Sequence, residues 1–206
     1  MRVDLRRIVE GLRSLNSGVI EPFDLVLAIL HAFGGRAPSR VHVHCALFVA
    51  SRHLGWVGEV LEFKAYRMGP WSEEVDDVLE VASHSGLLTV SRGGVALTRR
   101  GTARAEAVWG RLSDGDRRVL EEVAGYLGGM GSDELLLYIY TVYGYTWESD
   151  VIARLLGRRR RLALSMLRKG LVSVELASRI AGMPLQDFVG YLKRRGLKPY
   201  TALIDL

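Results

Sequence analysis

The sequence predicts a mainly α-helical protein with one small β-hairpin. Apolar residues recur at spacings of three and four over most of the chain, and only one short stretch changes to the alternation typical of strands. Of the 206 residues, 49% are apolar, which is enough for packed cores. The longest uninterrupted apolar runs, such as 25–30 and 45–50, contain six residues, whereas a membrane span needs roughly 20. We therefore expect a globular protein without a membrane span.

The elements before the hairpin are predicted to be helices. Residues 1–20 contain an N-terminal amphipathic helix, and an almost wholly apolar helix follows over 23–33. Another apolar helix is expected at about 39–53. Ser72 can cap the next helix, which runs to about residue 85. This part of the chain therefore supplies three closely spaced helices after the N-terminal one.

The strand signal is confined to two short runs. Residues 87–90 and 95–98 flank a glycine-containing turn, so they predict a β-hairpin. Leu and Tyr occupy both faces of a later helix, and we therefore expect residues 113–150 to be a helical connector that helps to form a homodimer. The helices expected after the hairpin cover 102–112, 116–127 and 133–143.

Three helices followed by a hairpin is the order of a winged helix, so residues 21–112 predict a winged-helix domain. The motifs 69–75, 86–88 and 97–101, with the later segment 133–149, resemble a group of archaeal winged-helix proteins over residues 22–150. The shared residues are glycine turns and apolar faces. The resemblance therefore implies a fold more than a function.

Charge divides the chain into two parts. Residues 151–206 contain 12 Lys and Arg against 3 acidic residues, whereas residues 1–150 contain 16 basic and 20 acidic residues. A cationic segment of this kind is attracted to phosphate in a salt-dependent way. We therefore expect residues 151–206 to be a basic domain that contacts double-stranded DNA.

The same segment contains capping and turn residues that are typical of a helix-turn-helix. Ser173 can cap a middle helix, Ala177 permits a close helix crossing, Gly182 can end that helix and Pro184 can open the next. Residues 160–200 also resemble a family of small prokaryotic helix-turn-helix proteins that are predicted to be antitoxins. The residues that carry this resemblance are 167–170, Ser173, Ala177, 181–183, Phe188 and 195–196. The resemblance implies a toxin partner.

The last of these helices is predicted to read DNA. Leu185, Phe188, Val189 and Leu192 form an apolar stripe that is expected to be buried. The opposite side carries Gln186, which can bind adenine bidentately, and Gly190, which permits close approach. We expect DNA contacts from Arg158, Arg159, Arg160, Arg161, Arg168, Lys169, Arg179, Gln186, Tyr191, Lys193 and Arg194.

The helix at 72–85 is too acidic to press onto DNA. It carries five carboxylates and no Lys or Arg, which opposes binding to phosphate. The winged-helix domain is therefore expected to serve assembly or protein interaction, and its wing, with Arg92, Arg99 and Arg100, is the alternative DNA contact. The five carboxylates are those of Glu73, Glu74, Asp76, Asp77 and Glu80.

No pattern predicts catalysis, a metal site or a cofactor. His42, His44 and Cys45 do not share one helical face, and a single cysteine excludes an internal disulfide. The apolar neighbours of Cys45 predict an inert thiol. The glycine-rich turns lack the Lys-Ser/Thr context of a phosphate loop, and the aromatic residues at 138–147 are more typical of a core than of base stacking.

We therefore predict a DNA-binding transcriptional regulator that is not an enzyme. The alternative is an antitoxin or adaptor that binds a partner protein and regulates its own operon. Residues 2–7 are already amphipathic and lack the apolar block of a signal peptide, so we expect a cytoplasmic protein. For residues 158–161 the alternative is a solvent-exposed helix face without a binding function, which is common for a basic run on a helix.

Overall fold

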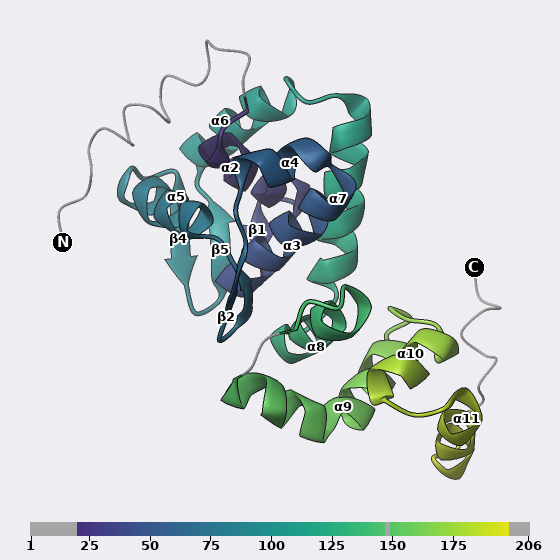
Figure 1. Cartoon of the computed structure of the whole chain (residues 1–206). Coiled ribbons are helices and arrows are strands. Elements are labelled where there is room, and N and C mark those ends of the chain that lie inside the picture. Colours follow the sequence, from purple (N-terminus) through teal and green to yellow (C-terminus); the bar gives the residue numbers. More distant parts are fainter. Residues whose placement is uncertain (1–19, 147–148, 198–206) are drawn as a thin grey trace. The chain divides into compact units, whose positions relative to one another are not determined.

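A computed structural model describes residues 20–146 and 149–197, and the chain divides into two compact units (Figure 1). The first unit comprises residues up to 64 and 70–128, and the second comprises 65–69 and the chain from 129 onward. The predicted fold class, mainly helical with a small antiparallel sheet, is confirmed. The helix predicted within residues 1–20 lies outside the described residues, which begin at 20. None of the described helices has the length and apolar character needed to cross a membrane.

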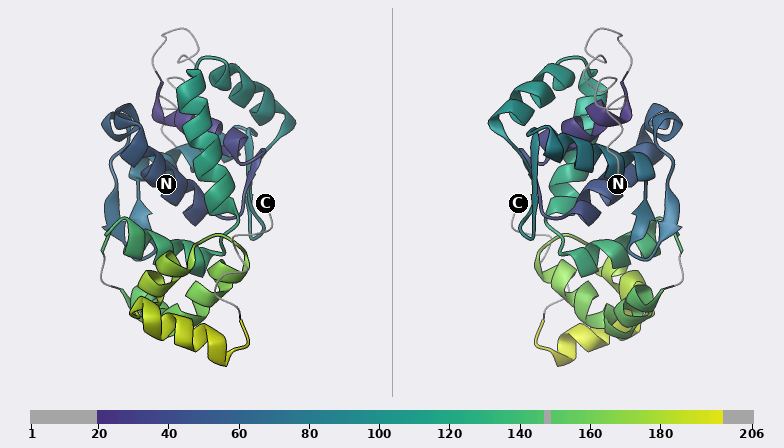
Figure 2. Two further views of the ribbon diagram at one scale, coloured as in Figure 1. Left: turned by 90° about the vertical axis from the view of Figure 1, so that its right-hand side faces the viewer. Right: turned by 90° about the vertical axis from the view of Figure 1, so that its left-hand side faces the viewer.

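The first unit is built around α2 (Pro22–Ala32), whose residues 23–30 are all buried. A helix that is apolar on every side must be surrounded by other elements. Here it is packed by α3, α5, α6 and α7, and α7 runs alongside both α2 and α3 (Figure 2). The helices packed on α2 are α3 (Arg40–His53), α5 (Glu73–His84), α6 (Arg99–Trp109) and α7 (Asp114–Gly128), and α4 (Gly55–Val60) packs on α3.

Asp24 is the charged residue inside this apolar helix. Its side chain is fully buried and accepts a hydrogen bond from Nη1 of Arg111 at 3.0 Å. A buried carboxylate is tolerated only when a partner of this kind replaces its hydration. The pair therefore fixes the segment after α6 against α2.

A three-stranded antiparallel sheet contains the predicted hairpin. The strands β4 (Leu88–Ser91) and β5 (Gly94–Leu97) pair with Leu88 opposite Leu97, and β1 (Arg36–Ala37) adds to the other edge of β5. The sheet order is β1-β5-β4. The sequence did not predict β1, α4 or a second hairpin formed by β2 (Lys64–Tyr66) and β3 (Gly69–Trp71).

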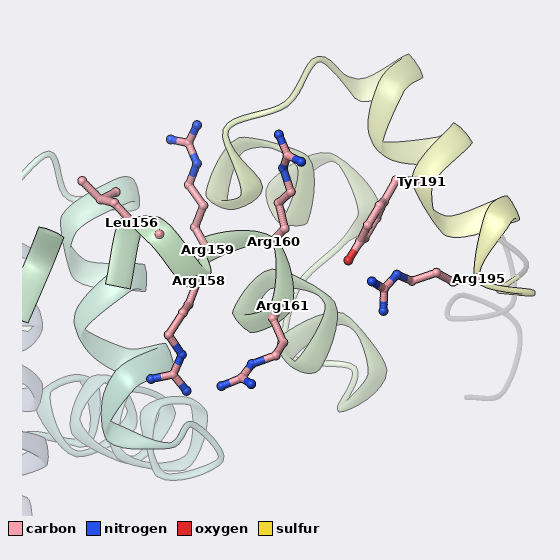
Figure 3. Close-up of a pocket in the computed structure, with 8 residues that line it drawn as sticks. Leu156, Arg158, Arg159, Arg160, Arg161, Tyr191 and Arg195 are labelled. Carbon is pink, nitrogen blue, oxygen red and sulfur yellow. The ribbon is translucent and has the colours of Figure 1, made fainter. Parts of the chain in front are cut away.

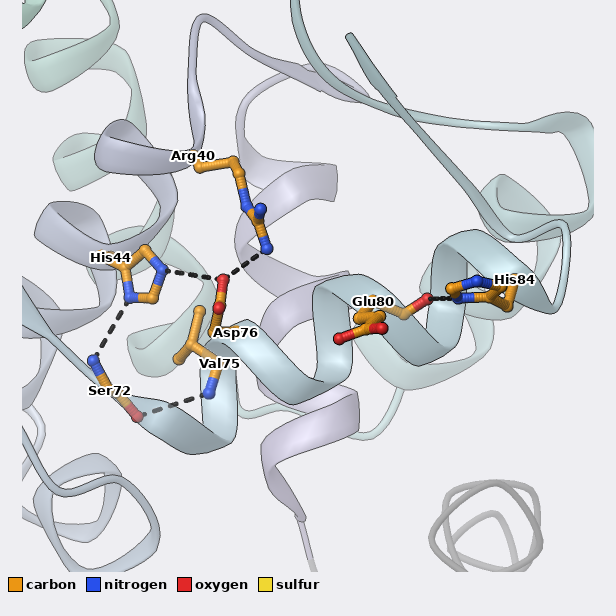
Figure 4. A network of polar contacts seen from close by, with 7 residues as sticks. All are labelled: Arg40, His44, Ser72, Val75, Asp76, Glu80 and His84. Atoms are coloured by element: carbon orange, nitrogen blue, oxygen red, sulfur yellow. Dashed lines mark hydrogen bonds and ion pairs between the residues drawn. The ribbon is translucent and has the colours of Figure 1, made fainter. Parts of the chain in front are cut away.

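A polar network joins α3 to α5 in the first unit (Figure 4). The imidazole of His44 is fully buried, stacks on the Trp71 ring at 3.8 Å, and accepts a hydrogen bond at Nδ1 from the Ser72 amide at 3.3 Å. Its Nε2 lies 4.0 Å from Asp76, which also pairs with Arg40. Burial, together with the nearby charge of Arg40, lowers the pKa of His44 to about 3. The imidazole is therefore neutral at ordinary pH.

In its described residues the second unit contains four helices, and the connector expected over 113–150 is divided between the two units. Its first helix, α7, packs in the first unit, whereas α8 packs on α9 and α10. Residues 135–137 and Ile139 of α8 are buried, and α9 and α10 cover part of the apolar surface that suggested a dimer interface. The helices are α8 (Ser132–Val142), α9 (Asp150–Arg168), α10 (Val174–Ala181) and α11 (Leu185–Arg194).

Candidate nucleic-acid interface

A short turn joins α10 to α11, and its local signals are those that the sequence predicted. The hydroxyl of Ser173 accepts a hydrogen bond from the Leu176 amide at 3.2 Å and so caps α10. Gly182 ends that helix in the left-handed conformation, with φ 63° and ψ 42°. Pro184 then occupies the N-cap position of α11. The turn is therefore set by residues that favour these backbone conformations.

The two sides of α11 differ as expected, with one exception. Phe188 and Leu192 are fully buried and Val189 is partly buried. Leu185, which was also expected to be buried, is 43% exposed. It stands in the first turn of α11, so the apolar stripe continues one turn beyond the core that covers it. The outward residues Gln186, Asp187, Lys193 and Arg194 are exposed, and Gly190 and Tyr191 are partly buried.

Two cations that the sequence assigned to DNA are engaged within the fold. Nη1 of Arg158 lies 3.1 Å from Asp133, and Nζ of Lys169 lies 2.6 Å from Glu134, in the first turn of α8. Burial opposes ionisation of Glu134, but hydrogen bonds from Lys169, the Gly131 amide and the Ser165 hydroxyl lower its pKa. Both pairs therefore hold α8 against α9, and these two cations are less available to phosphate than the sequence suggested.

Arg159 is engaged by the turn itself. Its Nη2 donates a hydrogen bond to the carbonyl oxygen of Gly182 at 3.4 Å. A Cβ placed on Gly182 would lie 2.1 Å from the Arg159 guanidinium carbon. A cation at the C-terminus of α10 is favoured by the helix dipole. Arg159 therefore stabilises the turn from α9.

Replacing Gly182 with Ala is expected to destabilise the second unit by roughly 1–2 kcal/mol, the cost of a left-handed residue with a side chain. The new Cβ also requires the Arg159 guanidinium to move. Urea unfolding followed by far-ultraviolet circular dichroism measures the change. Gly157→Ala on α9 is the matched control, because its Cβ meets nothing within 4 Å and Ala favours a helix. Equal stability of the two variants would contradict this role of Gly182.

Arg160 and Arg161 line a groove together with the end of α11 (Figure 3). Neither side chain forms an ion pair with a described residue. Tyr191 and Arg195 line the opposite side, and the Arg195 guanidinium lies over the Tyr191 ring at 4.8 Å from its centre. The cavity has a volume of about 780 Å³. The other lining residues are Leu156, Gly157, Arg158 and Arg159.

The four consecutive arginines do not form one surface. Successive residues of a helix are turned by about 100°, so a run of four must point in several directions. In Figure 3, Arg159 and Arg160 leave one side of α9, whereas Arg158 and Arg161 leave the other. Of the remaining predicted DNA contacts, Arg168 and Arg179 are exposed but do not line the groove.

Arg195 was not predicted from the sequence as a site residue. It follows Tyr191 by four positions, which is the spacing at which two helical side chains meet. That spacing was the available signal. It was not decisive, because nothing local indicates that α9 lies opposite the end of α11.

The three candidate metal ligands of α3 do not form a site. In the parts of the chain that the structure describes, no group of three or more His, Cys, Asp or Glu side chains is placed to hold a metal ion. His42 and His44 are buried, and each makes hydrogen bonds within the fold. Cys45 is fully buried, and burial raises the pKa of its thiol. A buried thiol of this kind is a poor nucleophile.

The groove and the exposed side of α11 are thus the cationic features to be explained. The chain matches no protein-family model, no curated protein and no solved structure. The resemblances to archaeal winged-helix proteins and to predicted antitoxins therefore stay predictions. The functional interpretation depends on the residues and their geometry.

Proposed function

We propose that the protein is a DNA-binding transcriptional regulator, in which α10 and α11 form a helix-turn-helix and α11 enters the major groove. The observation that carries this proposal is the exposed side of α11. Gln186, Lys193 and Arg194 are exposed there, while Phe188 and Leu192 anchor the opposite side in the core. A helix presented in this way fits a major groove about 12 Å wide.

The arrangement along α11 supports separate roles for its two ends. Gln186 lies in the first turn, where recognition helices contact base edges, and an amide can bind adenine at two positions. Lys193 and Arg194 lie in the last turn and can reach phosphates. Gly190, between them, has no side chain to hold the helix away from DNA. We assign base reading to Gln186 and positioning to the two cations.

For the first unit we propose a winged-helix arrangement that serves assembly or protein interaction. Its order of elements and the sheet order β1-β5-β4 are consistent with that fold, with β4 and β5 as the wing. In such proteins the helix before the wing, here α5, approaches DNA. Its acidic residues oppose this, although Arg40 neutralises Asp76 and Lys64 lies 3.7 Å from Glu73. This acidic helix also favours the second candidate function, an antitoxin or adaptor with a basic protein partner.

Selection of duplexes from a random library with the full-length chain tests the proposal. We expect an enriched sequence, and we expect Gln186→Ala to relax preference at one or two positions while leaving the salt dependence of binding unchanged. The matched control is Asp187→Ala, a neighbouring exposed residue that cannot pair with adenine in this way. Failure to enrich any sequence would contradict the proposed regulator.

A further inference from the structure

The groove between α9 and the end of α11 is separate from the outward side of α11. Its lining includes Arg160, Arg161, Tyr191 and Arg195, whereas Gln186 and Lys193 do not contribute to it. None of the described residues that line it is acidic. Its positive charge is therefore not neutralised from within the lining, and it attracts an anion.

Arg195 is held in place before any ligand arrives. Its guanidinium lies over the Tyr191 ring, and that ring stacks on Phe188 with 5.9 Å between the ring centres. Phe188 is fully buried, so the stack is anchored in the core. A stacked guanidinium keeps the N–H groups at its edge available, and little side-chain freedom is lost when they bind a phosphate.

Arg160 and Arg161 supply the other side of the groove. Both are exposed, and neither has an ion-pair partner among the described residues. Their side chains leave α9 in opposite directions in Figure 3, so one small anion cannot be expected to meet both. A cavity of about 780 Å³ is also larger than a single phosphate requires. These features fit an extended anion.

We propose that this groove binds two or more linked phosphate groups, through Arg160, Arg161 and Arg195, with Tyr191 positioning Arg195. Guanidinium groups suit this ligand because their planar fork matches phosphate oxygens. The linked phosphates belong either to the backbone of a DNA strand beside α11 or to a free oligophosphate, and the experiment distinguishes these two sources. The inference concerns the same unit as the proposed function, but it does not need α11 to read bases.

Isothermal titration of the full-length chain with inorganic tripolyphosphate tests the site, and a parallel titration uses duplex DNA. We expect one tripolyphosphate to bind per chain. Affinity should fall about tenfold or more in Arg195→Ala and in the double variant Arg160→Ala with Arg161→Ala. The matched control is Arg154→Ala with Arg118→Ala, which removes two exposed arginines, from α9 and α7, that do not line the groove and are not expected DNA contacts.

A positioning role for Tyr191 predicts a further difference. Tyr191→Phe keeps the ring and should bind nearly as the wild type, whereas Tyr191→Leu should weaken binding several-fold by releasing Arg195. Circular dichroism checks that each variant is folded. Equal binding by folded Tyr191→Phe and Tyr191→Leu would overturn the role of the tyrosine.

The two titrations distinguish the sources of phosphate. Tripolyphosphate binding that depends on the three arginines identifies a free oligophosphate. A loss of DNA affinity in the same variants without tripolyphosphate binding identifies the DNA backbone. If the groove variants bind both ligands as the wild type does, the proposal is overturned. A chain that binds tripolyphosphate but no duplex keeps this site and refutes the proposed DNA-binding function.

Discussion

Replacing Lys193 and Arg194 together with Ala is expected to weaken duplex DNA binding about a hundredfold at roughly 0.1 M salt. Each phosphate contact releases a counterion, which is worth nearly one decade of affinity at that concentration. Both side chains are exposed in the last turn of α11, and Ala is a good helix former, so the helix should be preserved. Fluorescence anisotropy over a salt series should also show the slope of log K against log salt falling by about 2.

The control must remove the same charge from elsewhere. Arg52→Ala with Arg118→Ala removes two exposed arginines of the first unit, from α3 and α7, and should leave DNA affinity within about threefold of the wild type. If this control weakens binding as much as the α11 variant, total charge rather than α11 determines affinity. The assignment of the interface to α11 would then be wrong.

The first unit is expected to lose stability steeply in mild acid because of His44. In the unfolded chain its pKa returns to about 6.5, while in the folded chain it is about 3. Below pH 6.5 the unfolded state therefore binds a proton that the folded state does not, and stability falls by up to about 1.4 kcal/mol per pH unit. The loss from this group should reach roughly 3 kcal/mol by pH 4.

The variant His44→Asn isolates this contribution. Its amide oxygen can accept the Ser72 hydrogen bond in place of Nδ1, but it does not titrate. We expect lower stability at pH 7, because the stack on Trp71 is lost, and a much flatter profile between pH 6.5 and 4. Urea unfolding followed by tryptophan fluorescence reports the first unit, which contains Trp56, Trp71 and Trp109 of the four tryptophans.

The exposed His84 provides the control, since His84→Asn should retain the acid-induced loss seen in the wild type. The comparison concerns slopes, so a uniform decrease in stability does not affect it. Asp76 and Arg40 face the imidazole and remain unchanged in both variants. A profile for His44→Asn as steep as that of the wild type would show that other groups determine the acid response.

Local sequence signals predicted the helices well because their causes are local. The caps Ser72 and Ser173 and the left-handed Gly182 act through hydrogen bonds or backbone angles within a few residues. The strand β1 contains only two residues and pairs with β5 about sixty positions later, so no local alternation reveals it. Long-range pairing of this kind is not visible in one sequence.

The candidate site shows the same division between local and long-range causes. The period of the apolar residues of α11 predicts which side of the helix is exposed and which is buried. The structure agrees, except that Leu185 of the apolar stripe is exposed. The ion pairs of Arg158 and Lys169 join residues 25 and 35 positions apart and depend on the packing of α8 against α9. The number of Lys and Arg residues does not separate these two paired cations from Arg160 and Arg161, which have no ion-pair partner among the described residues; the packing of the helices does.

The almost inaccessible carboxylate of Glu134, with only 6% of its side chain exposed, has a practical consequence for preparing the protein. Dissolved ions screen contacts at an open surface strongly but penetrate a covered one poorly. A wash in concentrated sodium chloride should therefore release cellular polyanions from the exposed arginines of α9 and α11, whereas Lys169, itself 44% exposed, keeps more of its attraction to the covered Glu134 carboxylate. Absorbance at 260 and 280 nm before and after the wash would reveal what the purified material had carried.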